Sequence, residues 1–364
     1  MLEMNEMLKL VVEREGSDLH ISVGKAAVMR IHGTLDVIDP HVLTPEDTDR
    51  LMREITPPRY QQMIQETGSA DFAYAYSDLA RFRCAVFRAR GNISIVMRLI
   101  PSKILSFEQL GLPQDSIIEV LNAHRGLVLI TGPTGSGKTT TLATMMDYIN
   151  ANRYVHIITI EDPLEYTHPH KRAIVTHREL HVDTPSFAYA LRGALRQDPD
   201  VILVGEMRDL ETMEAAITAA ETGHLVFATL HTISAAESIN RIIDAFPVNQ
   251  QEQMRAVLSV ALKTIISQTL LPRASGRGRV AAYEILHNTP AVANLIREKK
   301  TNRIISTIQT SAKQGMITMD DYLLTLYKRG IITGEICLER CHYPSEMREK
   351  MMGFISQSED QPVG

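Results

Sequence analysis

A glycine-rich run, GPTGSGKTT, occupies residues 132–140 and fits the pattern G-x-x-x-x-G-K-T. It follows the apolar run GLVLI and precedes a segment with apolar residues at helical spacing, the strand–loop–helix context in which such a run binds phosphate. Glycines let backbone N–H groups curl around phosphate oxygens, and the N-terminus of the following helix adds a favourable field. Lys138 is expected to reach the β and γ phosphates, and Thr139 to bind Mg²⁺. We therefore expect ATP and Mg²⁺ here, held by Thr134, Gly135, Ser136, Gly137, Lys138, Thr139 and Thr140.

Two glutamates follow apolar runs further along the chain. Glu161 ends IITIE, and Glu206 comes after VILVG. The carboxyl ends of parallel strands converge on the ligand crevice of a doubly wound sheet, so both side chains are expected near the γ phosphate. One would polarise the attacking water and the other would help to hold hydrated Mg²⁺, and the sequence leaves open which glutamate is the base. Acidic residues after strands are also common helix caps, but the phosphate loop upstream favours the catalytic interpretation.

A histidine and two arginines extend this set of candidates. His231 ends the run HLVFATLH and is expected to sense the phosphate state, although a single histidine at a strand end is usually a packed residue. The run TPSFAYALRGALRQDPD predicts a helix that Thr184 caps, with Pro185 in its first turn. Arg192 and Arg196 lie four residues apart in it, a spacing at which like charges mildly destabilise a helix. We expect them to face an anion, either a nucleotide phosphate or carboxylates of a neighbouring domain or subunit; two solvated arginines are the alternative.

Metal-ligand patterns are weak in this chain. Four histidines lie between the motifs: His168, His170, His177 and His181. The segment HRELH lacks the glutamate placement of H-E-x-x-H and a third ligand, so a solvated loop is predicted there. The cysteines have no tetracysteine spacing, so we expect no zinc, and their small odd number fits a reducing compartment: Cys84, Cys337 and Cys341.

The elements that must position these residues fall into distinct regions. From Arg125 onward, the apolar runs GLVLI, VHIITI, DVILVG and HLVFATLH alternate with helical segments, which predicts an α/β fold with a parallel sheet covered by helices on both faces. The end of the chain reads as helices. We expect an N-terminal domain over 1–100, a linker over 101–114, an ATPase core over 115–290, a helical C-terminal subdomain over 291–355 and a disordered tail over 356–364.

The N-terminal region shows a helix and then strands. Apolar residues from Met4 to Val12 recur at helical spacing, and Gly16 follows as a stop signal. In RFRCAVFRAR, Phe82, Cys84 and Val86 fall on one face of a strand, with Arg81 and Arg83 on the other. Gly91-Asn92 separates this strand from ISIVMRLI and predicts a two-residue hairpin turn.

Bulk composition limits the function classes. With 38 basic and 43 acidic residues the net charge is −5, which argues against a surface that coats nucleic acid or membrane. Glu3 and Glu6 stand where a signal peptide needs positive charge. The most apolar long segment, AVLSVALKTIISQTLL, is interrupted by Lys263 and by several hydroxyl residues, and it is shorter than the ~20 residues of a membrane-spanning helix. A cytoplasmic protein is expected.

Taken together, these motifs resemble the secretion and pilus ATPase superfamily, in particular the PilT-type retraction ATPases, over nearly the whole chain. The resemblance implies a RecA-like doubly wound P-loop domain and an N-terminal α+β PAS-like domain, whose opening is similar to GSDLHISVGKAAVMRIHGTL from Gly16. Lys138 and Thr139 match the Walker A motif, Glu161 and Asp162 the Asp box, Glu206 the Walker B carboxylate and His231 the His box. Thr139 and Glu206 are thus the expected metal-side residues. Where the family's N-terminal domain supplies basic residues to nucleotide at a subunit boundary, this chain has Arg81, Arg83 and Arg98.

Further along, AVANLIRE at 291–298 is similar to the family's A-I-R-N-L-I-R-E retraction element, and GMITMDDYLLTLYKRGII continues the match. Val292 for Ile is a mild change, whereas Ala293 replaces the first Arg of that element, which leaves the strength of retraction and the engagement of the platform protein open. Extension and type II secretion ATPases carry a tetracysteine zinc module, but 271–283 holds no Cys. A chain of this length is also expected to have no room for their further N-terminal domain. Both differences favour retraction over extension.

The resemblance implies a homohexamer that hydrolyses ATP to draw pilin out of type IV pili and supports twitching motility. It implies a cytoplasmic location, peripherally associated with the inner membrane at the pilus base, with a platform protein as partner and a sister pilus ATPase as a further candidate. Two alternatives remain. An ATP-dependent nucleic-acid translocase would need an aromatic-lined basic channel, and the chain has no Trp and 5% aromatic residues, so we expect no nucleic-acid partner. An accessory pilus ATPase subunit that does not hydrolyse ATP fits poorly with intact Lys138, Glu161 and Glu206.

Overall fold

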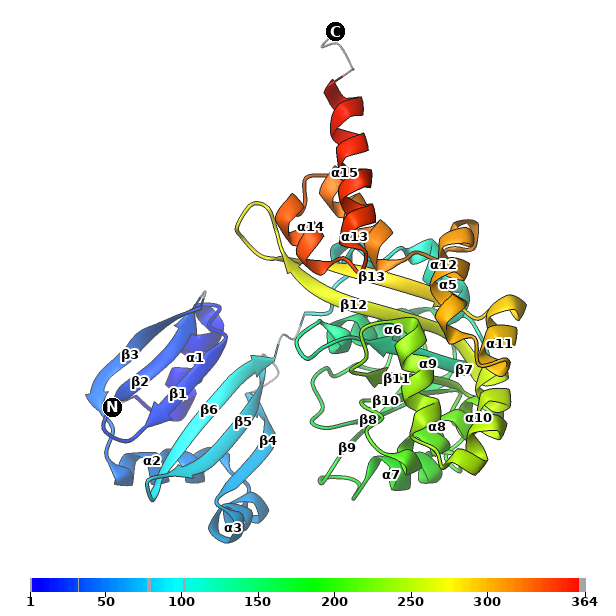
Figure 1. The fold of residues 1–364 in the computed structure, drawn as a ribbon. Coiled ribbons are helices and arrows are strands. Elements are labelled where there is room, and N and C mark those ends of the chain that lie inside the picture. Colours follow the sequence, from blue (N-terminus) through cyan, green and yellow to red (C-terminus); the bar gives the residue numbers. More distant parts are fainter. Residues whose placement is uncertain (1, 32, 77–79, 101–102, 360–364) are drawn as a thin grey trace. The chain divides into compact units, whose positions relative to one another are not determined.

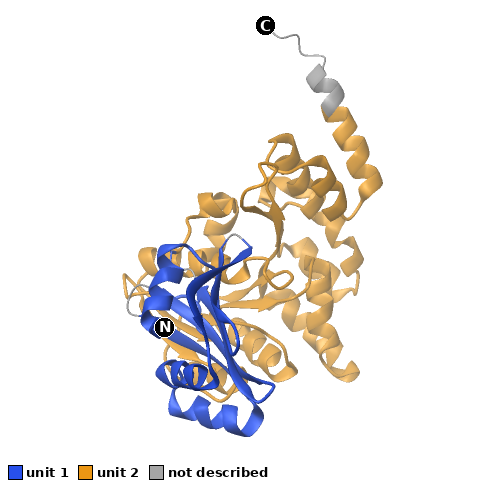
Figure 2. Ribbon diagram, turned by 90° about the vertical axis from the view of Figure 1, so that its left-hand side faces the viewer, with its two compact units in different colours: residues 1–103, 163–167 blue, residues 104–162, 168–364 orange. Residues whose placement is uncertain are grey.

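The computed structural model describes residues 2–31, 33–76, 80–100 and 103–359, and it divides into two compact units (Figure 2). Unit 1 comprises Met1–Lys103 and Pro163–Thr167, and unit 2 comprises Ile104–Asp162 and His168–Gly364. The segment expected as a linker contains the short helix α4 (Phe107–Leu110), and residues 101 and 102 of it lie outside the described residues. Helix α15 (Pro344–Glu359) enters the segment expected to be a disordered tail, whose residues 360–364 also lie outside the described residues.

Unit 1 is a six-stranded antiparallel sheet with helices packed on it, in the strand order β3-β2-β1-β6-β5-β4. The predicted N-terminal helix is confirmed, and its Met7 and Leu8 pack with Ile21 and Phe82 in one fully buried core. The two-faced strand is also confirmed, because Phe82, Cys84 and Val86 are buried while Arg83 is exposed. The elements are α1 (Met4–Glu13), β1 (Asp18–Ser22), β2 (Ala26–Ile31), β3 (Thr34–Val42), α2 (Pro45–Ile55), α3 (Pro58–Thr67), β4 (Ser69–Tyr76), β5 (Ala80–Ala89) and β6 (Asn92–Ile100).

The hairpin between β5 and β6 turns one residue earlier than predicted. Ala89 pairs with Asn92, so the two turn residues are Arg90 and Gly91. Both have positive φ, 51° and 81°, as a two-residue turn that matches the twist of its strands requires. The prediction that Gly91 is a turn residue is confirmed, but Asn92 belongs to β6, and Arg90 is the other turn residue with a left-handed conformation.

Unit 2 contains a seven-stranded sheet in the order β13-β12-β7-β11-β10-β8-β9, parallel except for the β12–β13 pair (Figure 1). Four predicted strands are confirmed as β7 (Gly126–Thr131), β8 (His156–Glu161), β10 (Val201–Val204) and β11 (Leu225–Leu230). Side chains alternate between the two faces of β7: Leu127 and Leu129 join one buried core, and Val128 and Ile130 join the other. The sheet therefore lies between two layers of helices, as the alternating pattern predicts.

The helices of the two layers come from different parts of the chain. The layer that covers Leu127 and Leu129 contains α7 (Phe187–Ala194), α8 (Leu210–Glu221), α9 (Ala235–Asp244), α10 (Val248–Ala261), α11 (Pro290–Arg297) and α12 (Ile304–Thr310). The layer that covers Val128 and Ile130 contains α4, α5 (Gln114–Leu121), α6 (Lys138–Asn152), α13 (Met319–Lys328), α14 (Gly334–Arg340) and α15. A short 3₁₀ turn, η1 (Thr301–Arg303), lies between α11 and α12, and a second, η2 (Ala312–Gln314), lies between α12 and α13.

Three strands of unit 2 were not predicted. The apolar segment that begins at Ala256 is the end of α10 followed at once by β12 (Leu262–Pro272), which forms a hairpin with β13 (Arg279–His287). The sheet edge opposite β13 is β9 (Ile174–Glu179), whose sequence IVTHRE is too polar to read as a strand. β12 matters most for function, because it lies directly beside β7 and the loop that follows β7.

Candidate active site

The phosphate loop lies where the sequence places it, between the fully buried strand β7 and helix α6. Its three glycines, Gly132, Gly135 and Gly137, all have positive φ, at 145°, 79° and 91°. Gly132 also has no room for a side chain, because a Cβ atom there would lie 2.2 Å from the carbonyl oxygen of Gln268. The loop therefore needs glycine both for its backbone conformation and for its close approach to β12.

Lys138 starts α6 and reaches back over the loop. Its Nζ atom donates to the carbonyl oxygens of Gly132 at 2.7 Å and Pro133 at 3.2 Å. Thr134 and Gly135 are exposed, and Thr139 and Thr140 are half-buried in the first turn of the helix. The lysine, the threonine hydroxyls and the backbone N–H groups thus lie together at a helix N-terminus, where an anion is favoured.

The two candidate glutamates follow neighbouring strands. β8 ends at Glu161, and β10 leads into Gly205 and Glu206. The N–H of Gly205 donates to the carbonyl of Ile160 at 2.8 Å, and a Cβ atom on Gly205 would lie 3.3 Å from the Cα of Glu161. A side chain at 205 would thus be tightly placed against β8, and the pairing of β10 with β8 brings the two acid-bearing strand ends side by side. Glu161 is 8% exposed.

His231 and Glu206 are brought into direct contact. The Nε2 atom of His231 lies 2.9 Å from Oε1 of Glu206, and Nε of Arg208 lies 2.8 Å from the same oxygen. Burial alone would raise the pKa of Glu206, but the hydrogen bonds and charges of Arg208 and His231 outweigh it and hold this pKa below its ordinary value. Glu206 is therefore an ionised carboxylate at neutral pH.

Arg208 was missed as a functional candidate. It stands two residues after Glu206 in GEMRD, and its pKa is raised mainly by the hydrogen bond to that carboxylate, with a further contribution from the charge of Asp162. The sequence could have indicated it, because Arg208 is a basic residue only two positions after the glutamate that follows β10. The position of the β10 end is itself fixed, because the N–H of Met207 donates to the carbonyl of Thr229 in β11 at 3.1 Å.

The helix that carries Arg192 begins later and ends sooner than predicted. Ser186, not Thr184, caps α7, since the Ser186 hydroxyl accepts from the N–H of Tyr189, and the helix ends at Ala194. Arg196 therefore lies beyond the helix, and the two arginines do not stack on it. Arg192 contacts Glu211 of α8 at 2.9 Å, with both side chains well exposed. The anion that faces Arg192 within this chain is a carboxylate of the same unit, and Arg196 is exposed.

The arginines of the N-terminal region all lie in unit 1. Arg83 on β5 is directly opposite Arg98 on β6, which in turn is opposite Asp18 on β1. Nε of Arg98 contacts the Asp18 carboxylate at 2.9 Å, and Arg81 is half-buried. Two like charges opposite each other destabilise an antiparallel pair, and Asp18 offsets this for Arg98.

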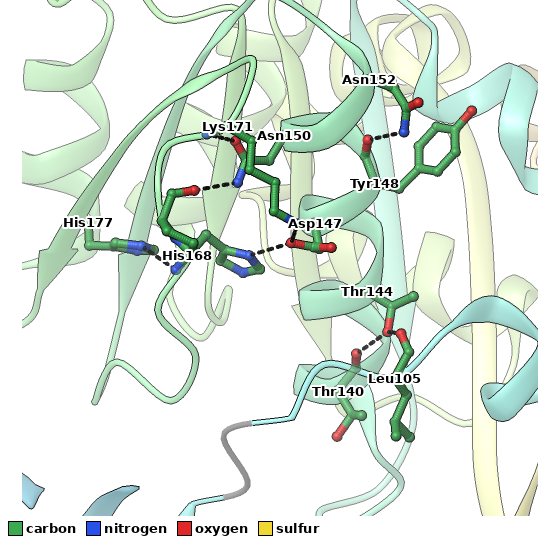
Figure 3. A network of polar contacts seen from close by, with 11 residues as sticks. Leu105, Thr140, Thr144, Asp147, Tyr148, Asn150, Asn152, His168, Lys171 and His177 are labelled. Carbon is green, nitrogen blue, oxygen red and sulfur yellow. Dashed lines mark hydrogen bonds and ion pairs between the residues drawn. The ribbon is translucent and has the colours of Figure 1, made fainter. Parts of the chain in front are cut away.

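A polar network joins α6 to the loop that follows β8 (Figure 3). Asn150 is fully buried; its Nδ2 atom donates to the carbonyl of Pro169 at 2.7 Å, and its Oδ1 atom accepts from the N–H of Lys171 at 3.1 Å. One turn earlier in α6, Asp147 forms an ion pair with Nζ of Lys171 at 2.6 Å. Helix α6, which begins with Lys138, therefore also fixes residues 169–171.

The prediction of a solvated histidine loop was wrong for His168 and His177. His168 is 6% exposed, and burial is the main reason that its pKa falls to about 4. The backbone N–H of His168 donates to the ring atom Nε2 of His177 at 3.0 Å. The ring proton of neutral His177 is therefore on Nδ1, which donates to the hydroxyl oxygen of Thr159 at 2.8 Å. His170 and His181 are exposed. Within the described ranges, no three His, Cys, Asp or Glu side chains gather in a way that could hold a metal ion.

The strand order and the loop after β7 define a phosphate-loop protein of the nucleotide-binding class. The chain belongs to the Type II/IV secretion system protein family, whose model matches residues 2–325. Among the helices in the described part of the chain, none has the length and apolar character needed to cross a membrane.

The chain is similar to two pilus proteins over most of its length. It is 46% identical to the type IV pilus retraction ATPase PilT of Pseudomonas aeruginosa, over 94% of this chain and 99% of that protein. It is also 46% identical to the twitching motility protein of Neisseria gonorrhoeae, over 88% and 85% of the two chains. A crystal structure of the pilus retraction motor PilT with bound ADP superposes with a TM-score of 0.89 at 48% identity, covering 96% of this chain and all of that one.

Proposed function

We propose that this protein is a motor ATPase that hydrolyses ATP to retract type IV pili, by withdrawing pilin from the fibre, and so supports twitching motility. One observation carries the proposal. The chain places Lys138 after the loop that follows β7, and Glu161, Glu206 and His231 at or just after the ends of β8, β10 and β11, in a sequence 46% identical over 94% of its length to a pilus retraction ATPase. Pilus retraction is a property of that relative, and identity over nearly the whole of both chains is the reason to extend it to this chain.

In the proposed mechanism, backbone N–H groups of the phosphate loop bind the β and γ phosphates, and Lys138 leaves its loop carbonyls to neutralise charge on the transferred phosphoryl group. The Thr139 hydroxyl and the ionised Glu206 carboxylate are hard oxygen donors, so this donor set fits Mg²⁺. When bound, Mg²⁺ supplies charge neutralisation at the phosphate oxygens.

A division of labour between the two glutamates is part of the proposal. A carboxylate whose pKa is lowered is a weaker base but a more persistent anion, which suits Glu206 to the metal side. Glu161, next to it on β8, is then the group that polarises the attacking water. His231 contacts Glu206 on one side and leads into α9 on the other, so it is placed to report loss of the γ phosphate to that helix.

The proposed working form is a homohexamer at the cytoplasmic face of the inner membrane, where it acts on a platform protein at the pilus base. A sister pilus ATPase is a further candidate partner. Arginines are proposed to reach the nucleotide across the subunit boundary: Arg81, Arg83 and Arg98 of unit 1, and Arg192 and Arg196 of unit 2. Arg196 is the better candidate of the last two, because it is exposed and Arg192 already contacts Glu211.

Turnover by the purified protein tests this proposal, with Lys138→Ala as the inactive reference. We expect steady ATP hydrolysis by the wild type and a loss to background in the variant. Hydrolysis no faster than in Lys138→Ala would instead support the accessory subunit that does not hydrolyse ATP. Strong stimulation by single-stranded nucleic acid would support the translocase, against which the −5 net charge and the lack of Trp already argue.

A further inference from the structure

Gln268 lies on β12 next to the phosphate loop, and its side chain makes one hydrogen bond within the described part of the chain. Its Nε2 atom donates to the carbonyl oxygen of Ser136 at 2.6 Å, and the residue is 2% exposed. The preceding residue, Ser267, pairs in register with Thr131, the last residue of β7. The amide therefore reaches from the neighbouring strand to the middle of the loop.

This hydrogen bond also sets the direction in which the N–H of Gly137 points. The carbonyl of Ser136 and the N–H of Gly137 belong to one peptide unit, and in a trans peptide they point in opposite directions. A donor that holds the carbonyl toward β12 therefore turns the Gly137 N–H away from β12, toward the side from which phosphate is bound. Glycine at 135 and 137, both with positive φ, would otherwise leave this peptide free to rotate.

A purely structural explanation fits the site poorly. Three other buried positions on β12, Ile265, Ile266 and Leu271, are apolar, whereas its buried polar residues Thr264 and Ser267 each have a side-chain hydrogen-bond partner. The Oε1 atom of Gln268 is buried without a partner among the described residues, and a buried polar group that makes no hydrogen bond destabilises the fold. The opposite amide orientation would bring oxygen against the Ser136 carbonyl, so the donor orientation is chemically required. The uncompensated Oε1 atom is explained if the hydrogen bond made by the Nε2 atom of the same amide is needed for function.

We propose that Gln268 is a positioning residue for the nucleotide phosphates: it fixes the Ser136–Gly137 peptide so that the Gly137 N–H faces the bound phosphate. This rests on the proposed ATPase function and deepens it. Since the N–H contacts phosphate before and during the reaction, the residue should affect nucleotide binding more than the rate of the chemical step.

Gln268→Met tests the proposal, because methionine keeps the length and burial of the side chain and removes the donor. Ser267→Ala is the matched control: it removes a buried hydrogen bond of the same strand, from the Thr131 hydroxyl at 2.8 Å, without touching the loop peptide. We expect Gln268→Met to raise the Kd for ADP and the KM for ATP at least about tenfold, with a smaller fall in kcat. Ser267→Ala should lower the Tm similarly but leave the Kd for ADP within about twofold.

Gln268→Glu provides a rescue that a structural role would not show. A protonated carboxyl can donate its O–H to the Ser136 carbonyl, whereas a carboxylate cannot. Burial favours the neutral, protonated form of the carboxyl group. The affinity of the Gln268→Glu variant for ADP, relative to that of the wild type, should therefore recover as the pH is lowered from about 8 to about 6.

The proposal is overturned if Gln268→Met loses Tm but keeps ADP affinity like Ser267→Ala, or, should that variant not fold, if Gln268→Glu shows no pH-dependent recovery. Failure of the proposed function looks different, because the wild type itself would then not bind or hydrolyse nucleotide.

Discussion

Nε2 of His231 lies 2.9 Å from Oε1 of Glu206, which joins the end of β11 to the end of β10 across the expected γ-phosphate side of the sheet. Arg208 contacts the same oxygen at 2.8 Å, so one carboxylate oxygen is shared by two groups able to carry positive charge. In the proposed mechanism, Glu206 is the anion on the metal side, and this contact transmits a change at the phosphate to His231.

Glu206→Gln should therefore bind ATP but hydrolyse it slowly. The amide keeps the shape of the side chain but removes the negative charge, and such a loss of a catalytic carboxylate lowers kcat by roughly 10²–10⁴-fold. Nucleotide titration and steady-state hydrolysis on the same preparation check this. Loss of ATP binding, with kcat per bound nucleotide unchanged, would show that Glu206 has a structural role.

Arg208→Ala should move the acidic limb of the pH profile of kcat/KM to higher pH. In the wild type, Arg208 is the largest influence that lowers the pKa of Glu206, while burial acts in the opposite direction. Without the arginine, Glu206 takes up a proton at a higher pH, so activity is lost earlier as the pH falls. Arg208→Lys, which keeps the charge, should shift the limb less. An acidic limb in Arg208→Ala that coincides with the wild type would contradict this role.

Acid sensitivity of the fold should depend on His168. The folded pKa, about 4, lies below the ordinary value of 6.5, so the unfolded chain binds the proton more readily. The stability contributed by the neutral histidine is thus present above pH 6.5 and is lost as the pH falls toward about 4, by about 3 kcal/mol at most.

His168→Phe keeps the ring, its stacking on His177 and the backbone hydrogen bond, and removes the titration. Urea unfolding at pH 7 and pH 5 should show a smaller loss of unfolding free energy for this variant than for the wild type. His124→Phe, at an exposed histidine, is the control and should keep the wild-type difference. Equal losses in all three proteins would show that His168 stays accessible to protons.

Hydrolysis should require a ring in which Arg196 acts across a subunit boundary. An arginine supplied in trans can contribute ~10³ to 10⁵ in rate, far more than a solvated surface arginine. Arg196→Ala and Lys138→Ala should each be inactive alone, and mixing them at ring-forming concentration should restore part of the activity. Arg192→Ala, which breaks only the exposed contact with Glu211, is the comparison within the same helix region. Full activity of Arg196→Ala alone, or activity per chain that survives dilution to monomers, would refute the shared site.

The central sheet and the phosphate loop were predictable because their signals are local. β7, β8, β10 and β11 are short apolar runs that end at chemically distinctive residues, and GPTGSGKTT specifies its own backbone. Strand ends of a parallel sheet then bring Glu161, Glu206 and His231 together by topology alone.

The remaining features depend on contacts between distant residues. β12 was hidden because α10 ends at Ala261 and β12 begins at Leu262 with no glycine, proline or other turn residue between them, although Thr264, Ile265 and Ile266 are β-branched residues that favour a strand. Missing β12 also concealed Gln268, whose partner Ser136 is 132 residues away. His168 was taken for a solvated residue since its burial depends on α6 and β9 rather than on its polar neighbours in sequence.

The central claim is retraction, and pilus number on the cell surface tests it most directly. Deleting the gene and counting surface pili by electron microscopy should show more pili than in the parent strain, together with loss of twitching motility. Re-expressing the wild-type chain should restore both, and re-expressing Lys138→Ala should restore neither, because only hydrolysis by this chain withdraws pilin. A deletion strain without pili would identify an extension ATPase, and rescue by Lys138→Ala would show that its ATP hydrolysis is not needed; either result would contradict the account.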